Sequence, residues 1–193
     1  MKLTLASSLL PLLAAAAPSS KVTRDTAAFG VMSARSGSPI HLLPLNAAGS
    51  AFYLGGETES YCPFGNSSAL CPPGTETVFA GSGSGLSVEV PGGQEVYVNP
   101  SGALSFTVPH SAYIPAGSSL GPFVYTPGTE FGSWTFNGWG ASGFMACPTE
   151  DSKWQVFAAV SNATVPSGNV DDCLGFDALG VPTNGTAAAW EYL

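Results

Sequence analysis

The sequence predicts an all-β fold, and two observations carry that prediction. The 193 residues include 24 glycines and 16 prolines, a density that interrupts helices almost everywhere. Between these breakers lie about twelve short segments rich in β-branched and aromatic residues. We therefore expect a single compact β-sandwich or small Greek-key barrel with Gly/Pro-rich loops. Twelve strands would also fit three four-stranded repeats, so a β-trefoil is the alternative.

The N-terminus has the pattern of a secretory signal peptide at residues 1–16. Lys2 is followed by an apolar segment at residues 3–13, and Ala14, Ala15 and Ala16 supply small residues before the cut. The apolar segment is too short to remain as a membrane span, so we expect no membrane association of the mature form. Residues 17–28 are polar and are expected to form a flexible arm, which leaves residues 29–193 as one all-β domain.

The expected strands follow one another along this domain, and those at residues 40–45 and 51–55 form a hairpin around a loop at residues 46–50. Residues 86–90 alternate apolar and polar side chains, the pattern of a half-buried strand. Residues 57–74 contain no strand signal and are expected to form a loop region. The other strands are expected at residues 29–35, 77–81, 94–98, 103–108, 123–127, 133–136, 144–147, 154–160, 173–181 and 187–193. For the last of these segments a short helix is the alternative.

Four cysteines in a secreted chain predict two disulfides. The spacing favours Cys62 with Cys71, which closes a short loop, and Cys147 with Cys173, which closes a longer one. The two crossed pairings, which would tie the N-terminal half to the C-terminal half, stay open.

The stretch at residues 131–160 holds three of the four tryptophans, namely Trp134, Trp139 and Trp154. Clustered aromatic residues predict the core of the domain. Trp134 and Trp139 also stand beside small glycines, so the alternative is that one of them stacks on a sugar.

The charge pattern argues against several partners. The formal net charge is −8 with only 5 Lys and Arg residues, so no basic patch can form. Nucleic acid and anionic membrane surfaces both require clustered cations and are not expected as partners.

Motifs for catalysis are weak. The letters GSGSG at residues 81–85 match G-x-S-x-G, but they lie between two strands rather than at a strand-to-helix turn, so Ser84 is not predicted to be a nucleophile. His41 reads as an ordinary strand residue, and His110 is the second histidine. Four carboxylates could pair as in a glycosidase, but nothing singles any of them out: Glu89, Glu95, Asp172 and Asp177. No cofactor or metal motif occurs, and we expect no enzymatic activity.

Three N-x-[ST] sequons predict N-glycosylation at Asn66, Asn162 and Asn184. Surface glycans and few charges suit a protein that is held in a carbohydrate matrix.

Several long blocks of the sequence resemble the PhiA-type cell wall proteins of filamentous fungi, some of which are described as IgE-binding. The blocks are SGSPIHLLPL, VEVPGGQEVYVNPSGALSFT, GPFVYTPG, GSWTFNGWGASGFMACP and NATVPSGNVDDCLGFDAL. The resemblance covers most of the mature chain and departs at the N-terminal arm, at residues 57–74 and at the C-terminal tail. Among the sequons, the glycoprotein character of the family carries over at Asn162.

This resemblance implies a secreted, non-enzymatic cell wall glycoprotein required for phialide and conidium formation, with no catalytic residues. Its expected partners are wall polysaccharide, either glucan or chitin, or other wall proteins. A secreted carbohydrate-binding module for glucan or chitin is the first alternative, and a secreted enzyme or effector is the second.

Overall fold

The computed structural model describes residues 28–65 and 69–193. The predicted signal peptide, residues 17–27 of the predicted arm and the sequon asparagine Asn66 lie outside these residues. Ala28, which was expected to close the arm, is the first residue of a strand.

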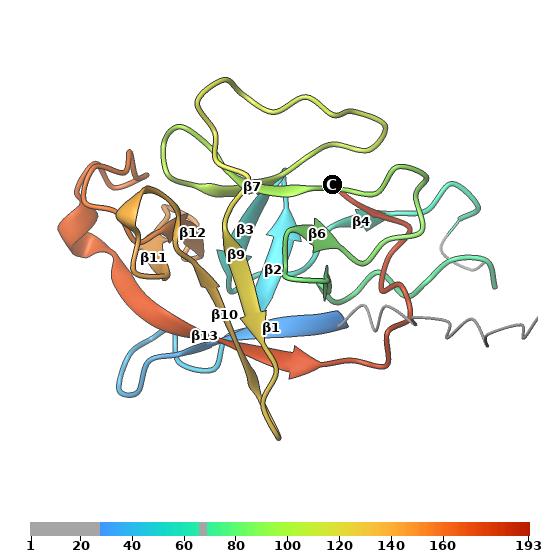
Figure 1. Cartoon of the computed structure of the whole chain (residues 1–193), viewed down its shortest axis with the longest axis horizontal. Helices are drawn as coiled ribbons and strands as arrows, with labels where there is room; N and C mark the ends of the chain where they lie inside the picture. Colours follow the sequence, from blue (N-terminus) through green and yellow to red (C-terminus); the bar gives the residue numbers. More distant parts are fainter. Residues whose placement is uncertain (1–27, 66–68) are drawn as a thin grey trace, which may run out of the picture.

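Within the described residues the chain forms fourteen strands and two single-turn 3-10 helices (Figure 1). The strands are β1 (Ala28–Ala34), β2 (Leu45–Ala48), β3 (Ala51–Leu54), β4 (Ser60–Tyr61), β5 (Phe79–Ala80), β6 (Gly85–Leu86), β7 (Val96–Val98), β8 (Leu104–Phe106), β9 (Phe123–Thr126), β10 (Gly132–Phe136), β11 (Phe144–Pro148), β12 (Trp154–Ala158), β13 (Leu174–Pro182) and β14 (Glu191–Tyr192). The helices are η1 (Gly138–Gly140) and η2 (Val170–Asp172). The prediction of a nearly all-β domain is confirmed.

Twelve of these strands belong to one antiparallel sheet. Its main path runs β6-β5-β1-β13-β11-β12-β3-β8-β7, with β2 beside β3, and β10 linking β13 to β9. The longest pairing joins β1 to β13, from Phe29 opposite Pro182 to Ala34 opposite Asp177. In Figure 1 these two strands run side by side although they lie near opposite ends of the chain.

The two ends of this path meet, so the sheet closes into a barrel-like form. Gly85 in β6 bridges Glu95, the residue before β7. Leu86 N donates a hydrogen bond to Gln94 O at 3.0 Å, and Val96 N donates one to Ser84 O at 2.9 Å. Closure pairs the two ends of this path, which would otherwise be open edges that invite aggregation, while β2 and β9 each keep one strand partner. Because the path does not divide into three consecutive four-stranded units, the β-trefoil alternative does not describe it.

The interior is filled by aromatic and aliphatic side chains from every part of the sheet. β13 shows how the sequence directs them, because its side chains alternate: Phe176 and Ala178 are buried, while Gly175 and Asp177 are exposed. Such alternation places one face of a strand on the core. The largest fully buried side chains are Trp134, Tyr192, Phe29, Phe52, Phe79, Phe106, Phe136 and Phe157.

The predicted strand at residues 40–45 is wrong. Residues 40–43 form a turn at the end of β1, because their backbone groups form hydrogen bonds with Ser33 instead of with a neighbouring strand. The Ser33 hydroxyl donates to Ile40 O and Leu43 O, and Leu42 N donates to Ser33 O at 2.8 Å. Leu42 has a φ of 60°, which a strand does not allow. The hairpin instead joins β2 to β3 through a turn at residues 49–50, so His41 lies in the preceding turn rather than in a strand.

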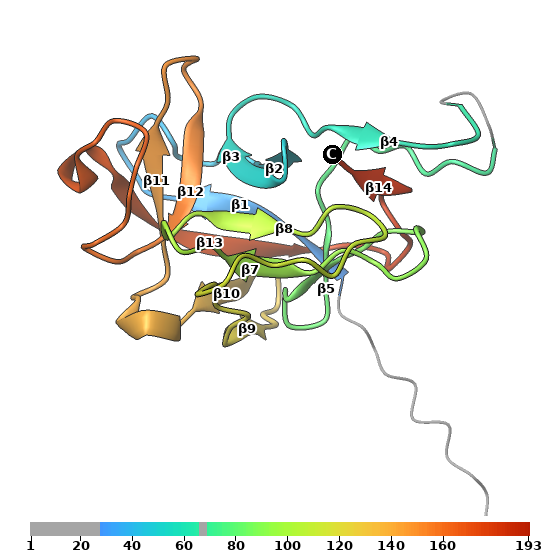
Figure 2. The same cartoon turned by 90° about the horizontal axis from the view of Figure 1, so that it is seen from above.

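The loop predicted at residues 57–74 contains one strand that the sequence did not reveal. β4 pairs with β14 in a separate two-stranded sheet, with Ser60 opposite Tyr192 and Tyr61 opposite Glu191. Figure 2 shows the two strands side by side, outside the large sheet. The expected strand at residues 187–193 is confirmed in part, since it is limited to Glu191 and Tyr192.

Candidate functional site

Trp134 lies in the centre of the core, as the core interpretation expects, so the alternative of a sugar-stacking tryptophan does not apply to it. It is 1% exposed, and its indole packs against aromatic rings. The ring centroids lie 4.5 Å from Phe79, 4.6 Å from Phe144 and 5.7 Å from Phe123. No face of the ring is left for a ligand, and the core interpretation of this residue is confirmed.

Trp139, five residues further on, has the opposite environment. It sits in η1 with a φ of 54° and is 48% exposed. Ala141 N donates to Gly138 O at 2.9 Å and closes the turn. The indole meets Phe136 edge-on at 6.3 Å between centroids, with an interplanar angle of 84°. The buried ring of Phe136 therefore packs against one side of the Trp139 indole, and much of the rest of the indole is accessible to a ligand.

Trp139 lines a surface hollow of about 280 Å³, near the small end of the usual range for ligand pockets. Segments far apart in the sequence build this hollow. Its other walls are the turn at residues 100–102, Gly117, and the loop after β12 that contributes Val160, Asn162 and Ala163. None of these described lining residues carries a charge, and we call this feature the Trp139 hollow.

The Asn99 side chain fixes the first wall of the Trp139 hollow. Its Oδ1 accepts hydrogen bonds from Ser101 N at 2.9 Å, from Ser101 Oγ at 2.6 Å and from Ala103 N at 3.1 Å. An Asn side chain that binds the backbone two residues ahead defines an Asx turn. The turn between β7 and β8 therefore keeps its shape without help from a ligand.

The opposite wall, the loop after β12, packs directly onto that turn. Ala158 N donates to Gly102 O at 2.9 Å, and Thr164 N donates to Ser101 O at 2.8 Å. Gly102 has a φ of 92°, which favours glycine, and a Cβ there would also lie 3.0 Å from the Cβ of Ala163. Asn162 lies between these two anchors and is exposed.

The sequons differ in what the structure shows of them. Asn162 lines the Trp139 hollow. Asn184 is also exposed, and its Oδ1 accepts hydrogen bonds from Thr186 N at 3.2 Å and from Thr186 Oγ1 at 2.7 Å. The pairing of Asn162 with Trp139 in one hollow could not be predicted, because it depends on the packing of segments far apart in the sequence.

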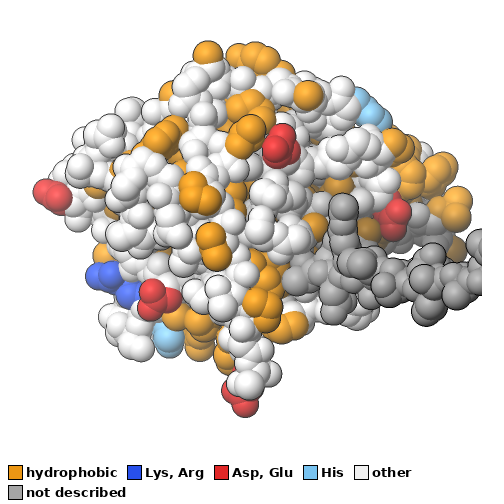
Figure 3. All heavy atoms as spheres, in the orientation of Figure 1, with side chains coloured by type: hydrophobic (Ala, Val, Ile, Leu, Met, Phe, Trp, Pro, Cys, Tyr) orange, Lys and Arg blue, Asp and Glu red, His pale blue; other side chains and the backbone are white. Residues whose placement is uncertain are grey.

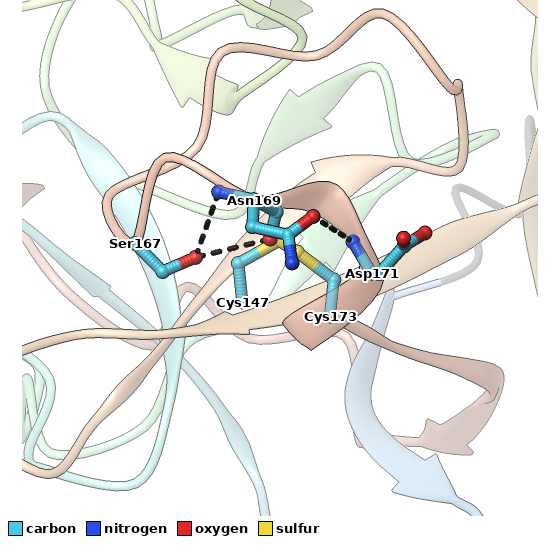
Figure 4. Close-up of a disulfide and its surroundings, with 5 residues drawn as sticks. All are labelled: Cys147, Ser167, Asn169, Asp171 and Cys173. Atoms are coloured by element: carbon cyan, nitrogen blue, oxygen red, sulfur yellow. Dashed lines mark hydrogen bonds between the residues drawn. A yellow bond between two sulfur atoms is a disulfide. The ribbon is translucent and has the colours of Figure 1, made fainter.

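Both predicted disulfides are present: Cys62 is bonded to Cys71, and Cys147 to Cys173. The second joins the end of β11 to the start of β13 (Figure 4). Just before Cys173, Asn169 Oδ1 accepts a hydrogen bond from Asp171 N at 3.1 Å and begins η2. The crossed pairings are excluded, because each half of the chain carries its own disulfide.

The residues considered for catalysis are scattered. Ser84 stands in the turn between β5 and β6 and accepts a hydrogen bond from Ser82 Oγ at 3.3 Å. Glu95 and His110 line a second hollow, while Asp177 lines a different one beside Arg35. Glu89 and Asp172 are exposed, Asp172 at the end of η2. In residues 28–65 and 69–193 no group of three His, Cys, Asp or Glu side chains could hold a metal ion.

The clearest carboxylate pKa shift belongs to a surface turn. Hydrogen bonds from Lys153, at 2.8 Å, and from Thr149 lower the pKa of Asp151 to about 2. Asp151 in turn raises the pKa of Lys153. Both side chains are exposed, and an ion pair in water adds little to stability. Asp151 therefore belongs to an exposed surface turn, where its ion pair with Lys153 accounts for the lowered pKa.

The face of the molecule shown in Figure 3 is mostly uncharged, and its few charged side chains lie apart from one another except where a basic and an acidic side chain lie side by side. Across the part of the chain that the structure describes, no helix is long and apolar enough to cross a membrane.

These features define a class: an all-β domain with two internal disulfides and a surface that carries few charges. The sequence model of the PhiA-like secreted protein family matches residues 29–193, and the chain belongs to that family. It is also 52% identical to a protein of Arthroderma benhamiae (strain ATCC MYA-4681 / CBS 112371) described as an uncharacterized secreted protein. That alignment covers 155 residues, 78% of this chain and 77% of the relative. No solved structure matches the chain.

The family match confirms the resemblance stated from the sequence, and the protein is a secreted one.

Proposed function

We propose that this protein is a non-enzymatic structural glycoprotein of the fungal cell wall, acting in phialide and conidium formation. The observation that carries the proposal is the match to the PhiA-like secreted protein family over residues 29–193. Two features of the chain support it. Charged residues make up only 9% of the sequence, and the two sequon asparagines that the structure describes, Asn162 and Asn184, are exposed. Neutral surfaces and glycans are compatible with close contact to wall polysaccharide.

Fractionation of hyphae and conidia tests this proposal. Culture medium, hot-detergent extract, reductant extract and glucanase-released material are probed for the protein, with a secreted fluorescent protein carrying the same leader as the control for trapping. We expect the protein to concentrate in the wall fractions while the control stays in the medium. Protein found only in the medium would remove the wall proposal and favour a secreted enzyme or effector.

A carbohydrate-binding module is the second candidate, and the half-exposed indole of Trp139 is the observation that favours it. Aromatic rings bury large apolar areas at binding sites, and the uncharged lining of the Trp139 hollow suits a neutral sugar. If the hollow binds wall polysaccharide, Trp139→Ala should weaken retention on insoluble glucan or chitin about tenfold, or about 1.4 kcal/mol. The protein for this test is produced without N-glycans.

The matched control is Tyr113→Ala, which removes an aromatic ring that is 73% exposed and does not line the Trp139 hollow. It should leave retention unchanged. Equal retention of the Trp139→Ala protein and the parent would exclude the hollow as a binding site for these polysaccharides.

A further inference from the structure

The Trp139 hollow contains both an exposed indole and a sequon asparagine. Asn162 lines the hollow together with Trp139, and the third residue of its sequon, Thr164, is hydrogen-bonded through its backbone to the opposite wall. We propose that the hollow is the docking site of the protein's own N-glycan, whose first N-acetylglucosamine, attached to Asn162, rests on the indole of Trp139. This inference rests on the glycoprotein part of the proposed function.

The polypeptide fixes the attachment point in relation to the hollow. The bonds of Ala158 to Gly102 and of Thr164 to Ser101 hold both ends of the segment that carries Asn162. Val165, the next residue, is buried, so the segment cannot swing outward as a free loop. A sugar linked to Asn162 therefore begins at the rim of the hollow.

The indole is fixed as well. Trp139 lies in a closed single-turn helix and packs edge-on against the buried ring of Phe136. A fixed ring loses little side-chain entropy when a ligand covers it. Covering the exposed part of the indole with the apolar face of a sugar removes apolar area from water, which is favourable in proportion to that area.

Attachment decides which sugar occupies the hollow. A tethered group acts at an effective concentration in the millimolar range when its linker matches the distance to be spanned. A wall polysaccharide would have to displace the attached sugar, which is present at that effective concentration, in order to bind in the hollow. The glycosylated protein thus has a closed Trp139 hollow, and a chain that lacks the Asn162 glycan has an open one.

Asn184 supplies the internal comparison. It lines a different hollow that includes Glu76 and Thr183 and contains no aromatic ring among its described lining residues. A glycan on Asn184 has no indole to rest on and should project into solvent.

Nuclear magnetic resonance of the secreted protein, with Asn162 occupancy first established by mass spectrometry, tests the proposal. The glycans are trimmed enzymatically to a single N-acetylglucosamine. We expect upfield ring-current shifts for the sugar on Asn162, contacts between its protons and those of the indole, and neither effect for the sugar on Asn184. Both effects should vanish in Trp139→Ala and persist in Trp190→Ala.

Thermal unfolding gives a second readout. Asn162→Gln and Thr164→Ala each remove the sequon, and each should lower Tm by about 2–4 °C. The drop should become much smaller when Trp139 is already Ala, and Asn184→Gln should show no such dependence on Trp139.

Four results would overturn the proposal: an unoccupied Asn162, an attached sugar without ring-current shifts, Tm losses that add independently of Trp139, or a fully glycosylated protein that binds insoluble glucan through Trp139. The wall fractionation of Asn162→Gln is a separate measurement. Protein retained in the wall without the glycan contact leaves the proposed function intact, so the two failures are distinguishable.

Discussion

Gln94 is a buried amide that holds the C-terminal strand in place. Its Nε2 donates to Tyr192 O at 2.9 Å and to Thr107 O at 3.0 Å, and its Oε1 accepts from Tyr192 N at 2.8 Å. The Tyr192 hydroxyl donates to Glu76 O at 2.8 Å and accepts from Val78 N at 3.1 Å. Buried polar groups must be paired in this way to avoid a desolvation penalty. Gln94 and Tyr192 therefore connect the C-terminal strand to residues 76–78 and to the backbone at Thr107.

Tyr192 should make stability fall at alkaline pH. Burial raises its pKa to about 12 from an ordinary value near 10. The unfolded chain ionises first, so this contribution is complete below pH 10 and is lost as the pH rises towards 12. The difference corresponds to about 2–3 kcal/mol. Tyr192→Phe should lose about 1–3 kcal/mol at pH 8 but show a shallower decline between pH 10 and 11.5.

Urea unfolding at several pH values measures both effects. Burial also raises the pKa values of Tyr97 and Tyr125, so part of the alkaline decline should remain in the variant. The control is Tyr61→Phe, an exposed tyrosine, which should follow the parent protein. Parallel curves for Tyr192→Phe and the parent would contradict the assignment.

The two central tryptophans show where single residues resist prediction from sequence. Trp134 and Trp139 both stand among glycines and aromatic residues, and local composition does not distinguish them. Trp134 lies on β10, where alternation turns its side chain to the core, whereas Trp139 lies in a turn with a positive φ. The two tryptophans differ in environment because the strand ends between them and η1 begins, and the sequence does not reveal where that change occurs.

At the scale of elements, the turn between β5 and β6 is constrained by the core beneath it. A Cβ on Gly83 would lie 2.1 Å from Trp134 Nε1, an atom that is buried and has no hydrogen-bond partner among the described residues. Gly81, in the same turn, has open space where its Cβ would stand. Both glycines have positive φ values, 85° and 63°, so they differ in packing rather than in backbone conformation.

Gly83→Ala should therefore destabilise the protein far more than Gly81→Ala. A left-handed conformation costs an alanine about 1–2 kcal/mol, and this is all that Gly81→Ala should lose. Forcing a methyl group against Trp134 adds about 1–3 kcal/mol of overpacking. Calorimetry and near-UV circular dichroism on the two variants measure the difference. Equal losses would mean that the indole can move away from the turn without cost.

The sequence predicted those elements whose signal is local. The strands that match β1, β3, β10, β11, β12 and β13 combine alternation or aromatic density with nearby Gly or Pro. The strand expected at residues 40–45 failed because Ser33 captures its backbone groups, and β4 was missed because its partner β14 lies about 130 residues away. A strand of two residues is too short to show an alternating pattern in the sequence, so a partner so far away cannot be recognised from it.

At the scale of the whole molecule, long-range connections dominate. The sheet closes by joining β6 to the residues before β7, and β1 pairs with β13 near the opposite end of the chain. The Trp139 hollow follows from the same topology, since its walls come from four separate segments. Composition could indicate the fold class and the candidate residues, but only the closed sheet brings Asn162 to Trp139.

The two disulfides should differ in how much each contributes to the free energy of unfolding. Cys147 is fully buried beside Phe157 and Val165, and its bond to Cys173 spans 26 residues between β11 and β13. The Cys62–Cys71 bond spans 9 residues next to exposed Tyr61 and Phe64. Chain entropy alone assigns them about 3.6 and 2.7 kcal/mol. Removing the first pair also disturbs packing in the core.

We therefore expect Cys147→Ala with Cys173→Ala to lower the free energy of unfolding by about 4 kcal/mol or more, and to reduce the yield of folded protein. Cys62→Ala with Cys71→Ala should lose less than about 3 kcal/mol, because its loop lies at the periphery and the core is unchanged. Denaturant unfolding of the two double variants makes the comparison. An equal or larger loss for the Cys62–Cys71 pair would show that the small β4–β14 sheet, rather than the β11–β13 junction, limits the stability of the whole domain.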